Sequence, residues 1–159
     1  MKDLIALLAA TPIEVARLIN ELPAATVVVK SSVDEFSILE NVCHLRDLEI
    51  EGYAVRIQRI LSEDCPTLAD FDGTRVALER DYNKQSLTEA LAGFTLARRR
   101  NLVQVEALTD EQFDRVGSMA GVGEISLRRL LEMMLEHDEG HLDDLRRSCR
   151  LAKSASSDL

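Results

Sequence analysis

The sequence predicts an all-α protein whose long helices pack as a four-helix bundle. Of its 159 residues, 46% are hydrophobic and 30% are charged, with few Gly and Pro and no Trp, which is typical of a helix-rich globular protein. Four segments carry apolar residues at helical spacing, and two of them begin with a capping box. The sequence shows no alternation of strands and helices and no internal repeat, so helix-on-helix packing is the expected architecture.

The first helix is predicted from Lys2 to Leu22 by the spacing of its leucine, isoleucine and valine residues. Thr11-Pro12 interrupts this pattern. Because Thr is a good N-cap and Pro suits the first helical position, the helix is expected either to restart at Pro12 or to kink there. Residues 23–36 are predicted as an extended linker, since the β-branched run Thr26–Val29 has no partner strand in the sequence.

The second helix is predicted from Ser37 to about Ser62, where Cys65-Pro66 follows and ends it. Ser37 and Glu40 form the Ser-x-x-Glu pattern of a capping box at its start. One face of this helix carries His44 together with four other residues, which are Asn41, Leu48, Gly52 and Val55. That face is mostly apolar, so His44 is expected to point inward.

The third helix is predicted from Ser86 to about Leu108 and is opened by a second Ser-x-x-Glu capping box. A short helical turn over residues 74–82 precedes it. The basic run Arg98-Arg99-Arg100 lies within this helix. We predict that the run forms a solvated face beside an acidic neighbour, because charge runs on helices usually do.

The last helix is predicted to start near Ser126, after a glycine-rich loop over Gly117–Gly123. Glycines without a preceding strand give no reason to propose a phosphate-binding loop. Residues 1–152 are expected to form a single domain. Residues 153–159 are small and polar and are expected to form a flexible tail.

Charge and cysteine content exclude several classes of protein. Lys and Arg total 19 against 28 Asp and Glu, a formal charge of −9, so nucleic acid is not an expected partner. The 3 cysteines are odd in number and far apart, which argues against a disulfide framework and a CxxC zinc site and favours a cytoplasmic location. No apolar run approaches about 18 residues, so no membrane partner is expected.

The histidines are the strongest candidates for a functional site. His137 and His141 are four residues apart, which on a helix puts both imidazoles on one face. The only other histidine is His44. Three neutral imidazoles can hold a divalent metal ion that keeps open coordination positions. An HxxxH pair also occurs by chance, and ordinary partly buried histidines remain the alternative interpretation.

Acidic residues near the histidines are candidates to orient the imidazole rings. Asp47 lies three residues after His44, and Asp144 three after His141, so either could accept a ring N–H. Two further acids, Asp138 and Glu139, are expected to be solvated or paired with another helix. For Arg80 and Tyr82, in the segment between the second and third helices, we expect structural hydrogen bonds.

Two stretches, HLRDLE at residues 44–49 and HDEGHL at residues 137–142, resemble those of the DinB-like metal-binding four-helix bundles. The resemblance extends from about Leu4 to Arg147. It implies an up-down-down-up bundle with a long crossover, often as a homodimer. It also implies one divalent metal ion, zinc or nickel with manganese or iron as alternatives, on the three histidines His44, His137 and His141.

Some proteins of this family are thiol S-transferases that use bacillithiol or mycothiol, and one is a mycothiol-dependent maleylpyruvate isomerase. The resemblance therefore implies a metal-dependent enzyme with a small-molecule substrate and, as in the S-transferases of the family, a low-molecular-weight thiol as cosubstrate. A thiolate formed at the metal would give an S-transferase, whereas an activated water would give a hydrolase. The alternative is a non-catalytic bundle that binds metal or a small ligand, and the sequence leaves the general base unassigned.

Overall fold

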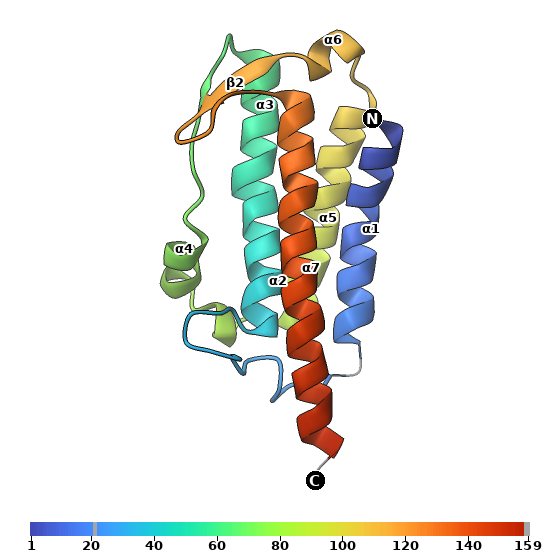
Figure 1. Ribbon diagram of the computed structural model, residues 1–159, viewed down its shortest axis with the longest axis vertical. Coiled ribbons are helices and arrows are strands. Elements are labelled where there is room, and N and C mark those ends of the chain that lie inside the picture. Colours follow the sequence, from blue (N-terminus) through green and yellow to red (C-terminus); the bar gives the residue numbers. More distant parts are fainter. Residues whose placement is uncertain (21, 158–159) are drawn as a thin grey trace.

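The computed structural model describes residues 1–20 and 22–157, with side chains described as far as Ser154 (Figure 1). Four long helical segments lie side by side, so the predicted four-helix bundle is confirmed. They are α1 (Lys2–Ile19), the composite segment α2–η1–α3 (Ile38–Asp47, Leu48–Tyr53 and Ala54–Ser62), α5 (Leu87–Glu106) and α7 (Leu127–Ser157). In Figure 1 the chain runs downward in α1 and α7 and upward in α2–η1–α3 and α5.

A long connection returns the chain from the upper end of α3 to the lower end of α5 (Figure 1). It contains the helix α4 (Gly73–Glu79) and the 3₁₀ turn η2 (Tyr82–Lys84). The helical turn predicted for this region is therefore confirmed, although it is divided in two. Asp72 caps α4 by accepting a hydrogen bond from the backbone N–H of Arg75 at 3.0 Å.

Helix α1 passes through Pro12 without restarting, and it ends at Ile19 rather than at the predicted Leu22. A proline inside a helix removes the N–H that would pair with the carbonyl four residues earlier, here that of Leu8. Nη1 of Arg98 on α5 donates to the Leu8 carbonyl oxygen at 2.9 Å. A side chain of another helix thus replaces the hydrogen bond that Pro12 cannot form. Of the two predicted alternatives, the restart at Pro12 is wrong, and the kink there stays a prediction.

The linker between α1 and α2 is folded into turns, so the prediction of an extended segment is wrong. The backbone N–H of Thr26 donates to the carbonyl of Pro23, and that of Val29 donates to the carbonyl of Thr26. Val27 is buried, and its carbonyl accepts a hydrogen bond from Leu39 at 2.9 Å. These turns satisfy backbone groups that would otherwise need a partner strand.

A small sheet lies at the upper end of the bundle, where we predicted a glycine loop and no strands (Figure 1). Its order is β1 (Thr67–Leu68), β2 (Val116–Met119) and β3 (Gly123–Ser126), with β1 parallel to β2 and β2 antiparallel to β3. Met119 pairs with Gly123 next to the hairpin turn. Gly121 and Gly123 adopt φ of 76° and 95°, which glycine allows at little cost. The glycines therefore form a turn between strands.

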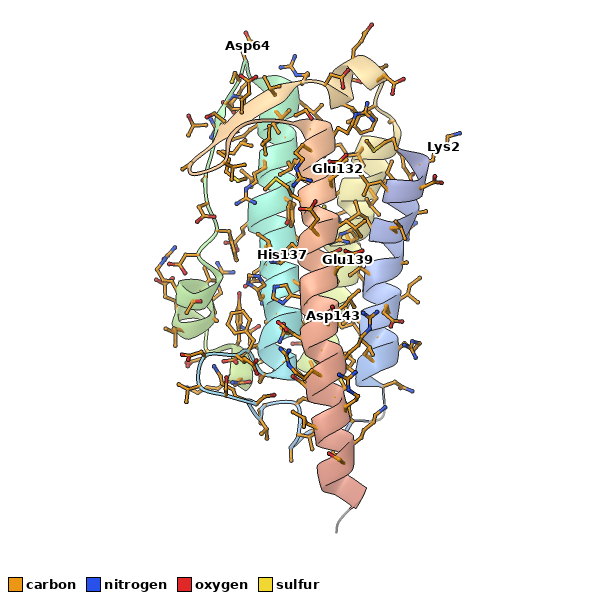
Figure 2. All side chains as sticks on the ribbon, viewed as in Figure 1. Lys2, Asp64, Glu132, His137, Glu139 and Asp143 are labelled. Atoms are coloured by element: carbon orange, nitrogen blue, oxygen red, sulfur yellow. The ribbon has the colours of Figure 1, made fainter. Side chains whose placement is uncertain are left out.

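The core consists of two apolar clusters stacked along the bundle. The upper cluster includes Ile5, Leu8, Leu48, Leu130 and Met134, and the lower cluster includes Val15, Val42, Leu45, Phe94 and Leu145. Along α7, His137 and His141 fall between Met134 of the upper cluster and Leu142 of the lower cluster, and on the second helical segment His44 lies about one turn before Leu48 of the upper cluster. Figure 2 accordingly shows His137 beside the upper half of α7. The bundle thus has a polar layer between two apolar layers.

Helix α7 continues to Ser157, so helical backbone extends into the segment predicted as a flexible tail. Residues 158 and 159 lie outside the described residues, and the flexibility of this segment stays a prediction. Among the helices that the structure describes, none is both long and apolar enough to cross a membrane.

Candidate metal centre

Helix α2 begins with the predicted capping box, which sets the direction in which His44 points. Oγ of Ser37 accepts a hydrogen bond from the N–H of Glu40 at 3.1 Å, and the Glu40 carboxylate accepts one from the N–H of Ser37 at 2.8 Å. Two turns later His44 is 7% exposed, so the prediction that it points inward is confirmed. The helix start therefore fixes the histidine against α7.

The three histidines converge on one point. Nε2 of His137 lies 3.1 Å from Nε2 of His141 and 3.3 Å from Nε2 of His44. His137 and His141 come from successive turns of α7, as their spacing predicted, and His44 faces them from α2. In the part of the chain that the structure describes, this is the one group of three or more possible ligands with the geometry to hold a metal ion.

These separations match those of nitrogen ligands on one metal ion. Two imidazole nitrogens that each lie about 2.0–2.1 Å from an ion are about 2.9 Å apart at a right angle and about 3.4 Å apart at the tetrahedral angle. The observed values of 3.1 and 3.3 Å fall between these limits. The spacing therefore fits a metal ligand set.

Burial keeps the rings in the neutral form that binds metal. Loss of hydration, together with the nearby His141, lowers the pKa of His44 to about 4 and that of His137 to about 3. Burial also lowers the pKa of His141. All three rings are therefore neutral at physiological pH, each with one N–H and one lone pair.

Asn41 fixes the tautomer of His141. The Asn41 amide donates from Nδ2 to the carbonyls of Ser37 at 3.1 Å and Phe36 at 3.3 Å, so its Oδ1 is the atom that lies 2.6 Å from Nδ1 of His141. Nδ1 of His141 must therefore carry the proton, which leaves a lone pair on Nε2. Asp144, which the sequence offered as a candidate for this role, does not fill it, because Asp144 accepts a hydrogen bond from Arg147 at 2.7 Å.

Hydrogen bonds alone cannot satisfy the cluster. Nε2 of His141 carries only a lone pair, so Nε2 of His137 would have to donate to it. Nε2 of His137 would then have no lone pair to accept a hydrogen bond from His44. If it accepted a hydrogen bond from His44 instead, it would carry a lone pair, and the lone pair on Nε2 of His141 would have no donor. A cation satisfies all three lone pairs at once. The donor set, like the spacing, therefore fits a bound metal ion.

Asp47 does not orient His44, so that prediction is wrong. The buried Asp47 carboxylate instead accepts hydrogen bonds from Arg46 at 2.6 Å, Arg80 at 2.7 Å and Tyr82 at 2.8 Å. The structural hydrogen bonds expected of Arg80 and Tyr82 are confirmed. Among the described residues, Nδ1 of His44 has no hydrogen-bond partner.

Gly73, at the start of α4, leaves the space that the His44 ring occupies. A Cβ atom at this position would lie within 2.5 Å of two ring atoms of His44, a distance far inside van der Waals contact. Replacing Gly73 with alanine should displace the ring and weaken metal binding by roughly 10- to 100-fold, the effect of losing a group that orients a ligand. Competition with a chelator would measure this change.

Gly140→Ala is a matched control, because a Cβ there meets nothing within 4 Å although the residue directly precedes His141. Its metal affinity should equal that of the wild-type protein. Equal affinity in the Gly73 variant would show that the position of the His44 ring does not limit binding.

A π-helix changes which residues of the second helical segment face the histidines. Segment η1 carries i→i+5 hydrogen bonds, such as that from the N–H of Ala54 to the carbonyl of Glu49, and so inserts one residue into the turn. The predicted face is therefore wrong for Val55, which is 44% exposed, whereas Asn41, Leu48 and Gly52 are buried as His44 is. The positions that face the histidines are taken by Tyr53, one residue after Gly52, and by Arg56, one residue after Val55.

A cavity of about 240 Å³ adjoins the histidines. His44, His137, Tyr53, Arg56 and Asp70 line it, together with the apolar side chains of Leu48, Phe71, Met119, Leu130 and Met133. Sequence reasoning missed Tyr53 and Arg56, because helical periodicity does not reveal a π-helix. The cavity gives a small molecule access to the cluster.

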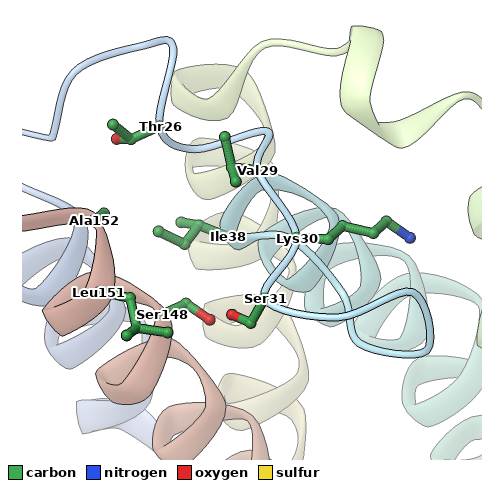
Figure 3. A pocket seen from close by; sticks show the side chains of 8 residues that line it. All are labelled: Thr26, Val29, Lys30, Ser31, Ile38, Ser148, Leu151 and Ala152. Carbon is green, nitrogen blue, oxygen red and sulfur yellow. The ribbon is translucent and has the colours of Figure 1, made fainter. Parts of the chain in front are cut away.

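Another cavity, of about 290 Å³, lies at the lower end of the bundle between the linker and α7 (Figure 3). Its lining consists of apolar and hydroxyl side chains and Lys30, and includes Ile38, Ser148 and Leu151. No histidine lines it, so we do not assign it a role in the chemistry of the cluster.

Behind the histidines lies a buried charged network that the sequence did not predict. Arg98 is 1% exposed and contacts Asp138 at 2.6 Å and Glu49 at 2.9 Å. The prediction of a solvated face is therefore wrong for Arg98, although Arg99 and Arg100 are exposed. Asp138 was expected to be either solvated or paired with another helix, and it pairs with Arg98 on α5. Because Asp138 directly follows His137, this pairing also anchors the helix turn that carries the histidine.

Comparison with known proteins agrees with this fold. The sequence profile of the DinB superfamily matches residues 7–145. A solved structure, YfiT from Bacillus subtilis, described as a probable metal-dependent hydrolase with an unusual four-helix bundle topology, superposes with a TM-score of 0.86 at 19% sequence identity, covering 94% of this chain and 85% of that one. No curated protein matches the sequence. Because the profile covers most of the chain, this protein belongs to the DinB superfamily.

Proposed function

We propose that this protein is a metal-dependent hydrolase of a small ester or amide. The observation that carries the proposal is the convergence of three Nε2 atoms, at separations of 3.1 and 3.3 Å, beside a cavity. YfiT, which has the same fold, is described as a probable metal-dependent hydrolase. A divalent ion held by His44, His137 and His141 would supply Lewis-acid polarisation of a carbonyl group and activation of water.

The side chains around this site have distinct roles in the proposal. Asn41 holds the His141 ring in the tautomer that presents Nε2. The apolar side chains of the cavity exclude bulk water, which strengthens electrostatic interactions inside it. Tyr53 lines the cavity, with its ring centroid 6.3 Å from that of His137. Burial raises the pKa of Tyr53, so its hydroxyl stays protonated and can donate a hydrogen bond to a substrate oxygen that gains negative charge.

A panel of uncharged and anionic substrates tests the activity. The protein would be loaded in turn with zinc, nickel, manganese or iron(II) and offered methyl butyrate, monomethyl succinate and the corresponding amides. We expect hydrolysis of at least one substrate that depends on the metal and disappears in metal-free protein. If no loaded form hydrolyses any of them, the hydrolase proposal is wrong. Turnover of an electrophile only when a low-molecular-weight thiol is added would identify an S-transferase instead.

Replacing Tyr53 with phenylalanine should lower kcat about 100-fold, the usual effect of losing one donor to a developing oxyanion, and should leave KM nearly unchanged. The ring and its packing are retained, and among the described residues no protein group bonds to the hydroxyl. Steady-state kinetics would measure the change. Tyr82→Phe serves as the comparison, because its hydroxyl bonds to Asp47 outside the cavity. An unchanged kcat in the Tyr53 variant would remove this residue from the mechanism.

A further inference from the structure

Arg56 is a buried cation without a matched anion. It is 7% exposed, and its nearest carboxylate is that of Asp70, at 3.9 Å from Nη2 and with a side chain that is 90% exposed. An exposed carboxylate at that distance compensates a charge only weakly. Buried charges in proteins are normally paired. This guanidinium therefore has no buried counter-ion within the described chain.

Arg98 is the comparison within the same protein, because it is a buried arginine whose charge is balanced by buried carboxylates. Its guanidinium contacts two buried carboxylates, those of Glu49 and Asp138, at 2.9 and 2.6 Å. Both arginines lie inside the bundle near the level of the histidines. Arg98 faces away from the cavity that adjoins the histidines, whereas Arg56 lines it. The unmatched arginine is thus the one that a ligand can reach.

The orientation of Arg56 leaves part of its guanidinium available. Nε and Nη2 both donate to the carbonyl oxygen of Ala69, at 3.1 and 2.9 Å, which fixes the plane of the group. Among the described residues, Nη1 has no acceptor. The edge formed by Nη1 and the second N–H of Nη2 is the fork that binds a carboxylate through two parallel hydrogen bonds.

We infer that Arg56 binds an anionic group, a carboxylate, on the substrate of this site. This inference rests on the proposed hydrolase function, for which it names the substrate class. Leu48, Phe71, Met119, Leu130 and Met133 line the rest of the cavity. At about 240 Å³ the cavity is smaller than the 300–1,000 Å³ typical of sites for drug-sized ligands. The substrate is therefore a small molecule with an apolar body and one anionic end.

The positive charge of Arg56 in the cavity contrasts with the negative net charge of the whole chain. The protein carries a formal charge of −9, so its surface as a whole repels anions. Among the described side chains that line the cavity, Asp70 is the one acidic residue, and Arg56 is the one that carries a permanent positive charge. A bound divalent cation would add positive charge. The cavity therefore attracts an anion that the rest of the protein does not.

The competing explanation is that Arg56 only holds the segment around Ala69 against α3. The two explanations differ in their dependence on ligand charge. Cyclohexanecarboxylate and cyclohexanecarboxamide have nearly the same shape, but only the first is an anion. Calorimetric titration of both into the full-length zinc-loaded protein, repeated with metal-free protein, gives four affinities for each variant and requires no turnover.

The wild-type protein should bind the carboxylate at least 10-fold more tightly than the carboxamide. Arg56→Met should lose at least 10-fold in affinity for the carboxylate and less than 2-fold for the carboxamide, in both metal states. Arg59→Met is the matched control, because Arg59 lies on the same helix at the surface and pairs with Glu63 at 2.7 Å. It should retain both affinities.

Equal losses for both ligands in Arg56→Met would identify a purely structural role and overturn the inference. So would the absence of a charge preference in the wild-type protein, or a preference that Arg56→Met retains. If the variant does not fold, the Nε–H NMR signal of Arg56 in the wild-type protein decides, since the carboxylate should shift it and the carboxamide should not. A failure to hydrolyse any substrate would leave these affinities unchanged, so the two proposals fail separately.

Discussion

Replacing His137 with alanine should weaken metal binding roughly 100- to 1,000-fold, because a protein ligand contributes about 3 kcal/mol of the 10–16 kcal/mol typical of four-ligand zinc sites. His137 is the central member of the cluster, since its Nε2 approaches those of both other histidines. Metal content by mass spectrometry and competition with a chelator would measure the loss in protein prepared without a histidine tag.

The fold of this variant should remain intact. The described contacts of the His137 ring nitrogens are those of Nε2 with His44 and His141, and its buried Nδ1 has no partner, so removing the ring breaks no hydrogen bond outside the histidine cluster. Glu136→Ala is the control, because Glu136 is the exposed preceding residue and its one ion-pair partner among the described residues is Arg129, at 2.7 Å. If His137→Ala bound metal as tightly as this control, the three-histidine assignment would be wrong.

The parts of the site that the sequence predicted depend on local patterns. The capping box of Ser37 and Glu40 fixes where α2 begins, and the four-residue spacing of His137 and His141 fixes their common face. Both patterns are complete within one or two helical turns, where geometry follows directly from sequence. Only the approach of His44 from another helix needed the fold, and the apolar face around it indicated that it points inward.

The parts that the sequence did not predict depend on distant partners or on a change of helical period. Arg98 appeared to belong to a solvated basic run because its acidic partners are 40 and 49 residues away. Strand β2 pairs with β1, which lies about 50 residues earlier. The π-helix moves Tyr53 and Arg56 into the cavity by inserting a single residue, and apolar spacing gives no sign of such an insertion.

Replacing Arg98 with methionine should lower the free energy of unfolding by about 3–5 kcal/mol at pH 8, because it leaves buried carboxylates without a counter-charge. Glu49 and Asp138 would lose their cation, and the Leu8 carbonyl, which Pro12 cannot serve, would lose its donor. Since domains of this kind are typically stable by about 5–15 kcal/mol, this loss is a large share of the total. Urea unfolding followed by circular dichroism would measure it.

The pH dependence of the stability lost in Arg98→Met shows whether Arg98 stabilises the fold through its charge or through its packing. Burial raises the pKa of Glu49 even with Arg98 present, and without Arg98 that pKa should rise further. The folded variant then binds a proton that the unfolded chain releases, so its stability increases as pH falls from 8 to 5. The destabilisation should therefore shrink toward pH 5, whereas the exposed Arg100→Met control should stay within about 0.5 kcal/mol of wild type at both pH values. A loss that is equal at both pH values would mean that Arg98 acts through packing. A shrinking loss would show that paired charges directly behind His137 hold α7 and η1 together at the histidine layer.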